Sequence, residues 1–395
     1  MIHEVKFKNF FSFKDEGIIS FKVNEKAPKT EKYFADATGG NLSKVMSIFG
    51  HNASGKTNAL KAISFLQWFV VYAYTEKPDA KMPVVPFKFT NKKSDPVEIS
   101  VEFSIGKSLY IYFVSFTTHK ILNEKLKKKS HGKVKFSTLF ERSWKKGEKN
   151  NYIWNDKFNL GKNFHDRLRE NASVLATAIR DKHLESMEIF DFWKNVDVNV
   201  TAWGKMNNES RNLVSAANFF ENNPKIKKKA DKLLQKFDIG LEAINITKKE
   251  DDNGGVAFDL RGSHYGEYDL DFRFESSGTK KLFSILKNIL QTLEFGGVAV
   301  LDEFDTDLHP MMSEALLEMF FSKETNPNNA QLIFSAHSPH LLNLLDKYQI
   351  AFTEKNEKGE SEIWRMNEME NVRSDDNYYA KYLSGAYGAI PEFDL

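Results

Sequence analysis

The sequence predicts an α/β fold, in which a mixed or parallel sheet carries helices on both faces. From Ser277 onward, helix-like and strand-like apolar patterns alternate, which is typical of parallel strands joined by helices. Near residue 45 a short apolar run leads through a glycine-containing loop into a helical pattern, so the first part of the chain contributes a unit of the same kind. Between these parts we expect an antiparallel β lobe and an inserted helical arm.

Residues 1–160 are expected to form an N-terminal lobe. Alternating apolar and polar residues indicate half-buried strands, and a continuous apolar run indicates a buried one. The expected elements are strands at 2–8, 18–23 and 44–49, a helix at about 56–71, and two strands within 97–117 around Gly106.

A basic stretch follows at residues 120–149, with eleven Lys or Arg and three Glu. A solvated hairpin tip or loop would explain this composition, and so would a contact with a polyanion or a protein partner. Lys127, Lys128 and Lys129 are the strongest local candidates for such a contact. Nucleic acid therefore remains a candidate partner.

Residues 161–240 are expected to form the inserted helical arm, with Pro224 opening its last helix. Residues 241–395 should form a C-terminal lobe. In its first part, strand-like segments are broken by Gly254-Gly255 and by Gly262. The later elements are expected as a helix at 278–293, a strand at 297–301, a helix at 311–321, a strand at 331–335 and a helix at 338–345.

The composition excludes several classes of site and protein. The chain has no cysteine, which excludes disulfides and thiolate metal sites, and its net charge of +2 is unlike that of a dedicated nucleic-acid coat. Charged residues interrupt the early apolar runs, and no later run reaches the roughly 18 apolar residues of a membrane span. We therefore expect a cytoplasmic protein that does not contact membranes.

The most specific motif is GxxxxGK[ST], which spans Gly50 to Thr57. Its glycines allow a tight loop whose backbone N–H groups face phosphate oxygens, Lys56 adds a charge for the β and γ phosphates, and the Thr57 hydroxyl can bind Mg²⁺. An accidental glycine turn is the alternative, but the strand before the loop and the helix after it favour a phosphate-binding loop. The expected nucleotide-binding residues here are Gly50, His51, Asn52, Ala53, Ser54, Gly55, Lys56, Thr57 and Asn58.

A second motif is the apolar strand Val298–Leu301 that ends in Asp302 and Glu303. Such an ending is common in proteins and carries little meaning alone. After a phosphate-binding loop, however, it places Asp302 beside the metal and Glu303 where it can polarise the attacking water. We therefore expect Asp302 to act at the Mg²⁺ site and Glu303 to be a catalytic residue that polarises the attacking water.

The third motif, Ser276-Ser277-Gly278, directly precedes a helix. A serine N-cap with a glycine turn explains these residues locally. They also suit an anion site at a helix N-terminus, which would close over the phosphate of a second subunit.

The fourth motif ends a strand at His337. A histidine there could simply cap the strand, or it could reach the γ-phosphate and sense its loss.

The order of these four motifs resembles that of ABC-type ATPase heads. The opening KFKNFFSFKD resembles the start of RecF-like heads and of heads that are similar to structural maintenance of chromosomes (SMC) proteins. Leu308-His309-Pro310 resembles the subgroup that contains RecF-like and OLD-family ATPases. The tail from Tyr382 to Pro391 resembles that of RloA or AbiL-type ATPases in bacterial defence loci.

This resemblance implies roles for individual residues. Lys56 and Thr57 would bind phosphate and magnesium, Ser276, Ser277 and Gly278 would act in trans, and His337 would be the switch histidine. Two positions depart from the pattern. No glutamine can be placed in the expected loop, since Gln67 lies inside the first helix, and His309 stands where an aspartate usually follows the catalytic glutamate.

The resemblance therefore implies an ATPase that binds ATP and Mg²⁺ and acts as a dimeric switch in anti-phage defence. A homodimer or higher homo-oligomer is expected. A separate effector, a nuclease or another toxin, should carry any toxic activity. Two alternatives remain: a RecF-like ATPase of DNA repair or chromosome maintenance, and a scaffold that holds ATP with little turnover.

Overall fold

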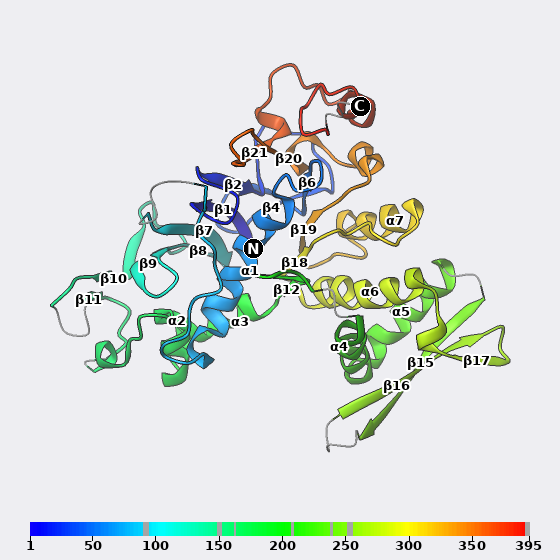
Figure 1. The fold of residues 1–395 in the computed structure, drawn as a ribbon, viewed down its shortest axis with the longest axis horizontal. Helices are drawn as coiled ribbons and strands as arrows, with labels where there is room; N and C mark the ends of the chain where they lie inside the picture. The colour runs from blue at the N-terminus through cyan, green and yellow to red at the C-terminus, as the bar shows by residue number, and fades with distance from the viewer. Residues whose placement is uncertain are drawn as a thin grey trace.

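The computed structural model describes residues 1–89, 95–147, 152–161, 163–206, 209–237, 240–250 and 256–391. Figure 1 shows a central parallel sheet with an antiparallel β lobe on one side and a group of helices on the other. None of the helices within these described ranges combines the length and the apolar character needed to cross a membrane.

The central sheet contains six strands in the order β12-β18-β19-β6-β20-β21. All neighbouring strands are parallel except the last pair. The strands are β12 (Val196–Val198), β18 (Val298–Leu301), β19 (Gln331–Ser335), β6 (Val45–Phe49), β20 (Ile350–Lys355) and β21 (Ser361–Arg365). Every residue of β6, β18 and β19 is buried, which explains their continuous apolar runs. The predicted α/β class is confirmed.

Helices cover both faces of this sheet. Val298 and Val300 of β18 face a core that includes helix α1 (Lys56–Val71), whereas Ala299 and Leu301 face a second core that includes α6 (Ser277–Phe295) and α7 (Pro310–Phe321). This division follows from the alternation of side chains along a strand. The observed bounds of α1 match the predicted helix.

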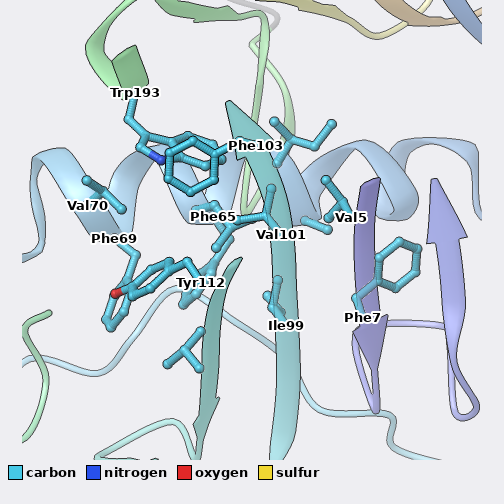
Figure 2. Packing of buried hydrophobic residues seen from close by; sticks show 14 of the residues in the cluster. Val5, Phe7, Phe65, Phe69, Val70, Ile99, Val101, Phe103, Tyr112 and Trp193 are labelled. Carbon is cyan, nitrogen blue, oxygen red and sulfur yellow. The ribbon is translucent and has the colours of Figure 1, made fainter. Parts of the chain in front are cut away.

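The antiparallel lobe is a seven-stranded sheet in the order β11-β10-β9-β8-β7-β1-β2. Its strands are β1 (Ile2–Lys8), β2 (Gly17–Ser20), β7 (Val97–Ile105), β8 (Ser108–Phe116), β9 (Ile121–Lys129), β10 (Ser137–Trp144) and β11 (Tyr152–Asp156). Figure 2 shows Phe65 and Phe69 of α1 lying among Val101, Phe103 and Tyr112 of this sheet. Each buried ring of this size contributes about 1.5–3 kcal/mol, so α1 is held firmly between the two sheets.

The basic residues Lys127, Lys128 and Lys129 lie within strand β9, in contrast to the expected loop or hairpin tip. Lys128 Nζ lies 2.6 Å from Glu185 Oε1 and 5.4 Å from the centre of the Tyr110 ring. Ile121 and Leu126 of β9 lie in the core, and the lysines pair with residues of β8 and β10, so strand pairing determines the conformation of this stretch.

Segment 161–240 contains strands as well as helices, and it does not form one separate arm. Its helices are α2 (Val174–Ala178), α3 (Leu184–Lys194), α4 (Glu209–Asn222) and α5 (Pro224–Phe237), and its further strands are β13 (Val200–Thr201) and β14 (Gly204–Lys205). Helices α2 and α3 contact α1, β12 joins the central sheet, and α4 and α5 pack on α6 (Figure 1). Burial of apolar faces thus divides this segment between two cores.

The remaining elements are short or peripheral. One sheet contains β15 (Leu241–Glu250), β16 (Val256–His264) and β17 (Tyr268–Asp271), another contains β3 (Lys22–Val23), β4 (Tyr33–Ala35) and β5 (Asn41–Ser43), and α8 spans Tyr378–Leu383. Gly262 was expected to interrupt a strand, but it lies inside β16, where it pairs with Ile244 and Leu270. Gly254 and Gly255 lie outside the described residues. The expected helix at 338–345 is a 3-10 helix at 339–344.

Candidate functional site

A cleft of about 720 Å³ lies at the carboxyl ends of β6 and β18, where open α/β sheets bind ligands. It brings together the GxxxxGK[ST] loop, the paired acids and the strand-end histidine. Its lining residues are Asn52, Ala53, Ser54, Gly55, Lys56, Thr57, Asn58, Asp302, Glu303, Thr306, His337 and Lys355. Three of the four motifs found in the sequence therefore share one cleft.

Two glycines shape the loop that starts this cleft. Gly50 has φ +154° and Gly55 has φ +125°. A Cβ atom on Gly50 would collide with the Thr353 carbonyl oxygen, and one on Gly55 would lie 2.7 Å from Ser361 Oγ. The loop consequently packs against β20 and β21 more closely than any other residue type allows.

Helix α1 begins directly after this loop, and no side chain caps its first turn. Its backbone N–H groups are thus left for an external acceptor, which is the arrangement that binds anions at a helix N-terminus. Lys56 Nζ donates hydrogen bonds to the carbonyl oxygens of Gly50 at 2.7 Å and His51 at 3.0 Å. Burial lowers the pKa of Lys56, although the nearby acids, first among them Asp302, oppose that shift.

The opening motif of the sequence supports the loop from outside. Ser12 Oγ accepts a hydrogen bond from Asn58 Nδ2 at 2.8 Å and lies 2.8 Å from Ser361 Oγ. Ser361 Oγ also lies 2.7 Å from the carbonyl oxygen of Ser54. The turn after β1 and strand β21 therefore both brace the loop.

Of the two acids that line the cleft, Asp302 makes more hydrogen bonds. Thr57 Oγ1 donates to Asp302 Oδ2 at 2.8 Å, and Ser335 Oγ donates to Asp302 Oδ1 at 2.5 Å. The amide of Asn199 accepts from the Asp302 backbone N–H at 2.6 Å and donates to its carbonyl oxygen at 3.0 Å. These contacts fix the Asp302 carboxylate beside the Thr57 hydroxyl.

Glu303 lies next to Asp302 with a left-handed backbone conformation, φ +50°. Its backbone N–H donates to Ser335 Oγ at 2.8 Å, and its Oε2 accepts from Lys205 Nζ at 2.5 Å. Burial alone would raise the pKa of Glu303, but the hydrogen bond and charge of Lys205, followed by the charges of His337 and Lys281, lower it below its ordinary value. Strained backbone of this kind often occurs at functional sites.

His337 follows strand β19, and its Nε2 lies 3.7 Å from Glu303 Oε1. The backbone N–H groups of His337 and Ser338 donate to the carboxylate of Asp305, which is itself buried. Asp305 therefore links the loop of the paired acids to the loop of the histidine.

The serine motif does not line the cleft. Ser276 is the N-cap of α6 and accepts from the Thr279 backbone N–H at 3.0 Å, which agrees with the local explanation of this motif. Ser277 is exposed, and a Cβ atom on Gly278 would lie 3.1 Å from the Asp307 carbonyl oxygen. The motif thus packs beside the loop that follows the paired acids.

Comparison with protein families shows that most of the chain matches one family. Residues 45–343 match the family described as "AAA domain, putative AbiEii toxin, Type IV TA system". The chain belongs to this family. No curated protein matches the sequence of this AAA domain.

Three solved structures are similar to this AAA domain at low sequence identity. The SMC head bound to the C-winged helix domain of ScpA is 12% identical with a TM-score of 0.52, covering 92% of this chain and 96% of that one. The SMC head with an extended coiled coil from Pyrococcus furiosus, bound to the C-terminal domain of ScpA, is 11% identical with a TM-score of 0.49, covering 92% and 95%. The SMC head from Thermotoga maritima is 13% identical with a TM-score of 0.42, covering 92% and 98%. The first of these likenesses confirms the expected head-type fold.

Sequence reasoning missed several residues in and around the cleft of the AAA domain. Asn199, Lys205 and Ser335 contact the paired acids, and Lys355 lines the cleft at the end of β20. Only Ser335, two residues before His337, carried a local signal. Gln67 lies on α1 away from the cleft and donates to the Val196 carbonyl oxygen at 3.5 Å. His309 caps the start of α7.

Proposed function

We propose that this AAA domain binds ATP with Mg²⁺ and hydrolyses the nucleotide, acting as a dimeric switch. The observation that carries the proposal is the contact of Thr57 with Asp302 at 2.8 Å, in the first turn of a helix that no side chain caps. Glu303 stands beside this pair at the edge of the same cleft. Hydroxyl, carboxylate and phosphate-binding groups therefore converge where phosphoryl transfer requires them.

The residues of the cleft fit both ATP and Mg²⁺. Hydroxyl and carboxylate oxygens are ligands that Mg²⁺ prefers, and Thr57 with Asp302 supplies one of each. Because Ser335 donates to Oδ1 of Asp302 and Asn199 binds the Asp302 backbone, Oδ2 stays oriented toward Thr57. The metal, when bound, neutralises charge that develops on the phosphates.

The remaining steps, which are phosphate binding and activation of water, are assigned to side chains and backbone groups of the protein. The N–H groups of the loop from Gly50 to Thr57 bind phosphate oxygens, and Lys56 exchanges its loop carbonyls for phosphate. Glu303 orients and deprotonates the attacking water, and His337 contacts the γ-phosphate from the opposite loop. Thr57 and Asp302 would hold the metal.

A second copy of the chain completes the site in this proposal. Ser276, Ser277 and Gly278 form a second helix N-terminus that can hold phosphate, yet they lie outside the cleft of their own subunit. In a two-fold dimer each subunit would present this surface to the cleft of its partner. Exposed Ser277 is available for such a contact.

We further propose a biological setting in bacterial anti-phage defence, with an effector on a separate polypeptide. The family description supports this setting because it names a toxin–antitoxin system. The resemblance of the tail to RloA or AbiL-type ATPases supports it as well. In this setting, the nucleotide state of the dimer would control the effector.

Two variants test the proposed reaction. Glu303→Gln should retain ATP binding but lose about 10²-fold or more of turnover, because the water-orienting carboxylate is gone. Lys56→Ala should instead weaken ATP binding, measured by calorimetry, because a charge-assisted contact is lost. Turnover of Glu303→Gln near the wild-type rate would overturn the role of Glu303, and unchanged ATP affinity of Lys56→Ala would overturn that of the loop.

The same assays separate the alternatives. Turnover that rises strongly with DNA would favour a repair ATPase of the RecF type. Tight ATP binding without measurable turnover would favour a scaffold. Turnover without DNA that changes when a co-expressed neighbouring gene product is added would support the defence switch.

A further inference from the structure

The catalytic carboxylate proposed above is paired with a lysine from the middle of the chain. Lys205 Nζ lies 2.5 Å from Glu303 Oε2, and the two residues are 98 positions apart in sequence. This pair is more protected than the surface pair Lys229–Glu294, since the Lys205 side chain is 19% exposed and that of Lys229 is 58% exposed. Reduced exposure weakens solvent screening, so the contact constrains Glu303 more than a surface ion pair would.

Lys205 is held in place by the segment around it. It ends the β13–β14 hairpin, and that hairpin is tied to α1 because Ser64 Oγ donates to the Val200 carbonyl oxygen at 2.8 Å. The Met206 backbone N–H donates to the Asn199 carbonyl oxygen at 2.8 Å, while the Asn199 amide binds the backbone of Asp302. One short segment therefore contacts both acids, Asp302 through Asn199 and Glu303 through Lys205.

A second lysine strengthens the positive charge behind Glu303. Lys205 and Lys281 both line a cavity of about 150 Å³, and neither of them lines the nucleotide cleft. Burial, followed by the charge of Lys205, lowers the pKa of Lys281 to about 8. Lys205 therefore reaches Glu303 from the residues that line this cavity, whereas Glu303 itself lines the cleft, and the charge of Lys281 also acts on Glu303.

The contact of Lys205 leaves the other oxygen of the carboxylate for the reaction. Oε2 accepts from Lys205, whereas Oε1 lies toward His337, with 3.7 Å between Oε1 and Nε2. We propose that Lys205 is a positioning residue for Glu303, anchoring Oε2 so that Oε1 faces the water that attacks the phosphate. This proposal rests on the proposed function of Glu303.

The decisive experiment is a double-mutant cycle measured as phosphate release in single-turnover conditions. Lys205→Gln should lower the rate about 10-fold or more, because a misplaced catalytic group loses much of its effect. ATP affinity, measured by calorimetry, should stay within about two-fold of wild type, since Lys205 does not line the cleft. Lys205→Arg should recover most of the rate, because it keeps the charge and the donors.

The cycle also shows whether Lys205 acts through Glu303. In a Glu303→Gln background, Lys205→Gln should cause no further loss, since coupled residues are not additive. Lys229→Gln is the matched control, as it breaks an exposed lysine–glutamate pair whose residues line neither the cleft nor the cavity of Lys205, and it should leave the rate unchanged. Thermal unfolding of each variant checks that the fold persists.

The possible outcomes separate the two proposals. If Glu303→Gln itself turns over normally, the proposed function of Glu303 fails and the role of Lys205 fails with it. If Glu303→Gln is inactive while Lys205→Gln is fully active, or while the two losses simply multiply, only the positioning role is overturned. A loss in Lys205→Gln that Lys205→Arg does not repair would likewise contradict anchoring by charge.

Discussion

At the scale of single residues, the cleft depends on side chains that stand far apart in the sequence. Thr57 and Asp302 are separated by 245 positions, and Asn199 and Asp302 by 103. Each of these contacts is an ordinary hydrogen bond worth about 0.5–1.5 kcal/mol, or somewhat more where a charge takes part. Their value lies in holding one carboxylate in a single orientation.

Lys355 is expected to add a phosphate contact to those proposed from the sequence. It lines the cleft at the end of β20, and no ion pair joins it to an acid in the described part of the chain. Lys355→Ala should weaken ATP binding about 10-fold, the loss expected for one charge-assisted hydrogen bond, and should affect adenosine binding much less. Calorimetry with both ligands measures the difference.

Lys358→Ala provides the control for this prediction, because Lys358 is exposed in the turn that follows β20. It should bind both ligands as wild type does. An equal loss for ATP and adenosine in Lys355→Ala would argue against a phosphate contact.

His3 is expected to make stability depend on pH. Burial lowers the pKa of His3 from 6.5 to about 4, although the charge of Asp36 opposes this shift. Between these two pH values His3 is protonated in the unfolded chain but not in the folded chain. The free energy of unfolding should therefore fall as the pH is lowered through this window. The slope from one such group is at most about 1.4 kcal/mol per pH unit.

Urea unfolding of wild type and His3→Gln across this window tests the assignment. The variant lacks the titrating ring, so its stability should fall less steeply as the pH is lowered. Parallel curves for the two proteins would mean that another group carries the dependence.

At the scale of elements, a buried ion pair joins the antiparallel sheet to the helices beside it. Glu124 on β9 and Arg142 on β10 are both fully buried, with Arg142 Nε 2.8 Å from Glu124 Oε2. Arg142 also donates to the Ala172 carbonyl oxygen, and Glu124 accepts from the Val174 backbone N–H at the start of α2. The pair thereby holds the start of α2 against the sheet.

Arg142→Met should therefore lower the free energy of unfolding by about 3–5 kcal/mol, because Glu124 would keep an uncompensated charge in the core. Denaturant titration measures the loss. The double variant Glu124→Leu with Arg142→Met should lose less than the single one, since it removes both charges. If the double variant were the weaker of the two, packing and not charge would explain the effect.

At the scale of the whole molecule, the proposed reaction requires two copies of the chain. The cleft and the serine motif lie on the same subunit without meeting, and only a second subunit would bring them together. Substitution at Gly278 is a poor test of this idea, because a Cβ there already presses on the Asp307 carbonyl oxygen of its own subunit. Exposed Ser277 offers a better position.

Ser277→Glu should spare ATP binding and block hydrolysis. A carboxylate in the first turn of α6 favours that helix through its dipole, yet it would repel the phosphate of the partner's nucleotide. Mixing this variant with Lys56→Ala should restore part of the activity, because one site of the mixed dimer joins an intact loop to an intact serine motif. Phosphate release measures activity, and light scattering with ATP measures dimer formation. Full activity of Ser277→Glu as a monomer would contradict the dimeric site.

The sequence by itself determined the elements whose signals are local. The loop from Gly50 to Thr57, helix α1 and the strands β6, β18 and β19 were predicted because their conformations follow from consecutive residues and short apolar periods. The order of the motifs along the chain was also sufficient to predict the head-type fold. Distances between neighbours in sequence are set by the backbone, so these features need no knowledge of the rest of the chain.

Only the tertiary structure decided which distant residues surround the acids and where the middle segment lies. Nothing around Lys205 in the sequence indicates a partner 98 positions away, and nothing around Asn199 indicates that it holds Asp302. The helices expected as one arm are divided between two cores, because each buries its apolar face against the nearest complementary surface. Such contacts arise from the packing of the whole chain, which no local pattern of residues specifies.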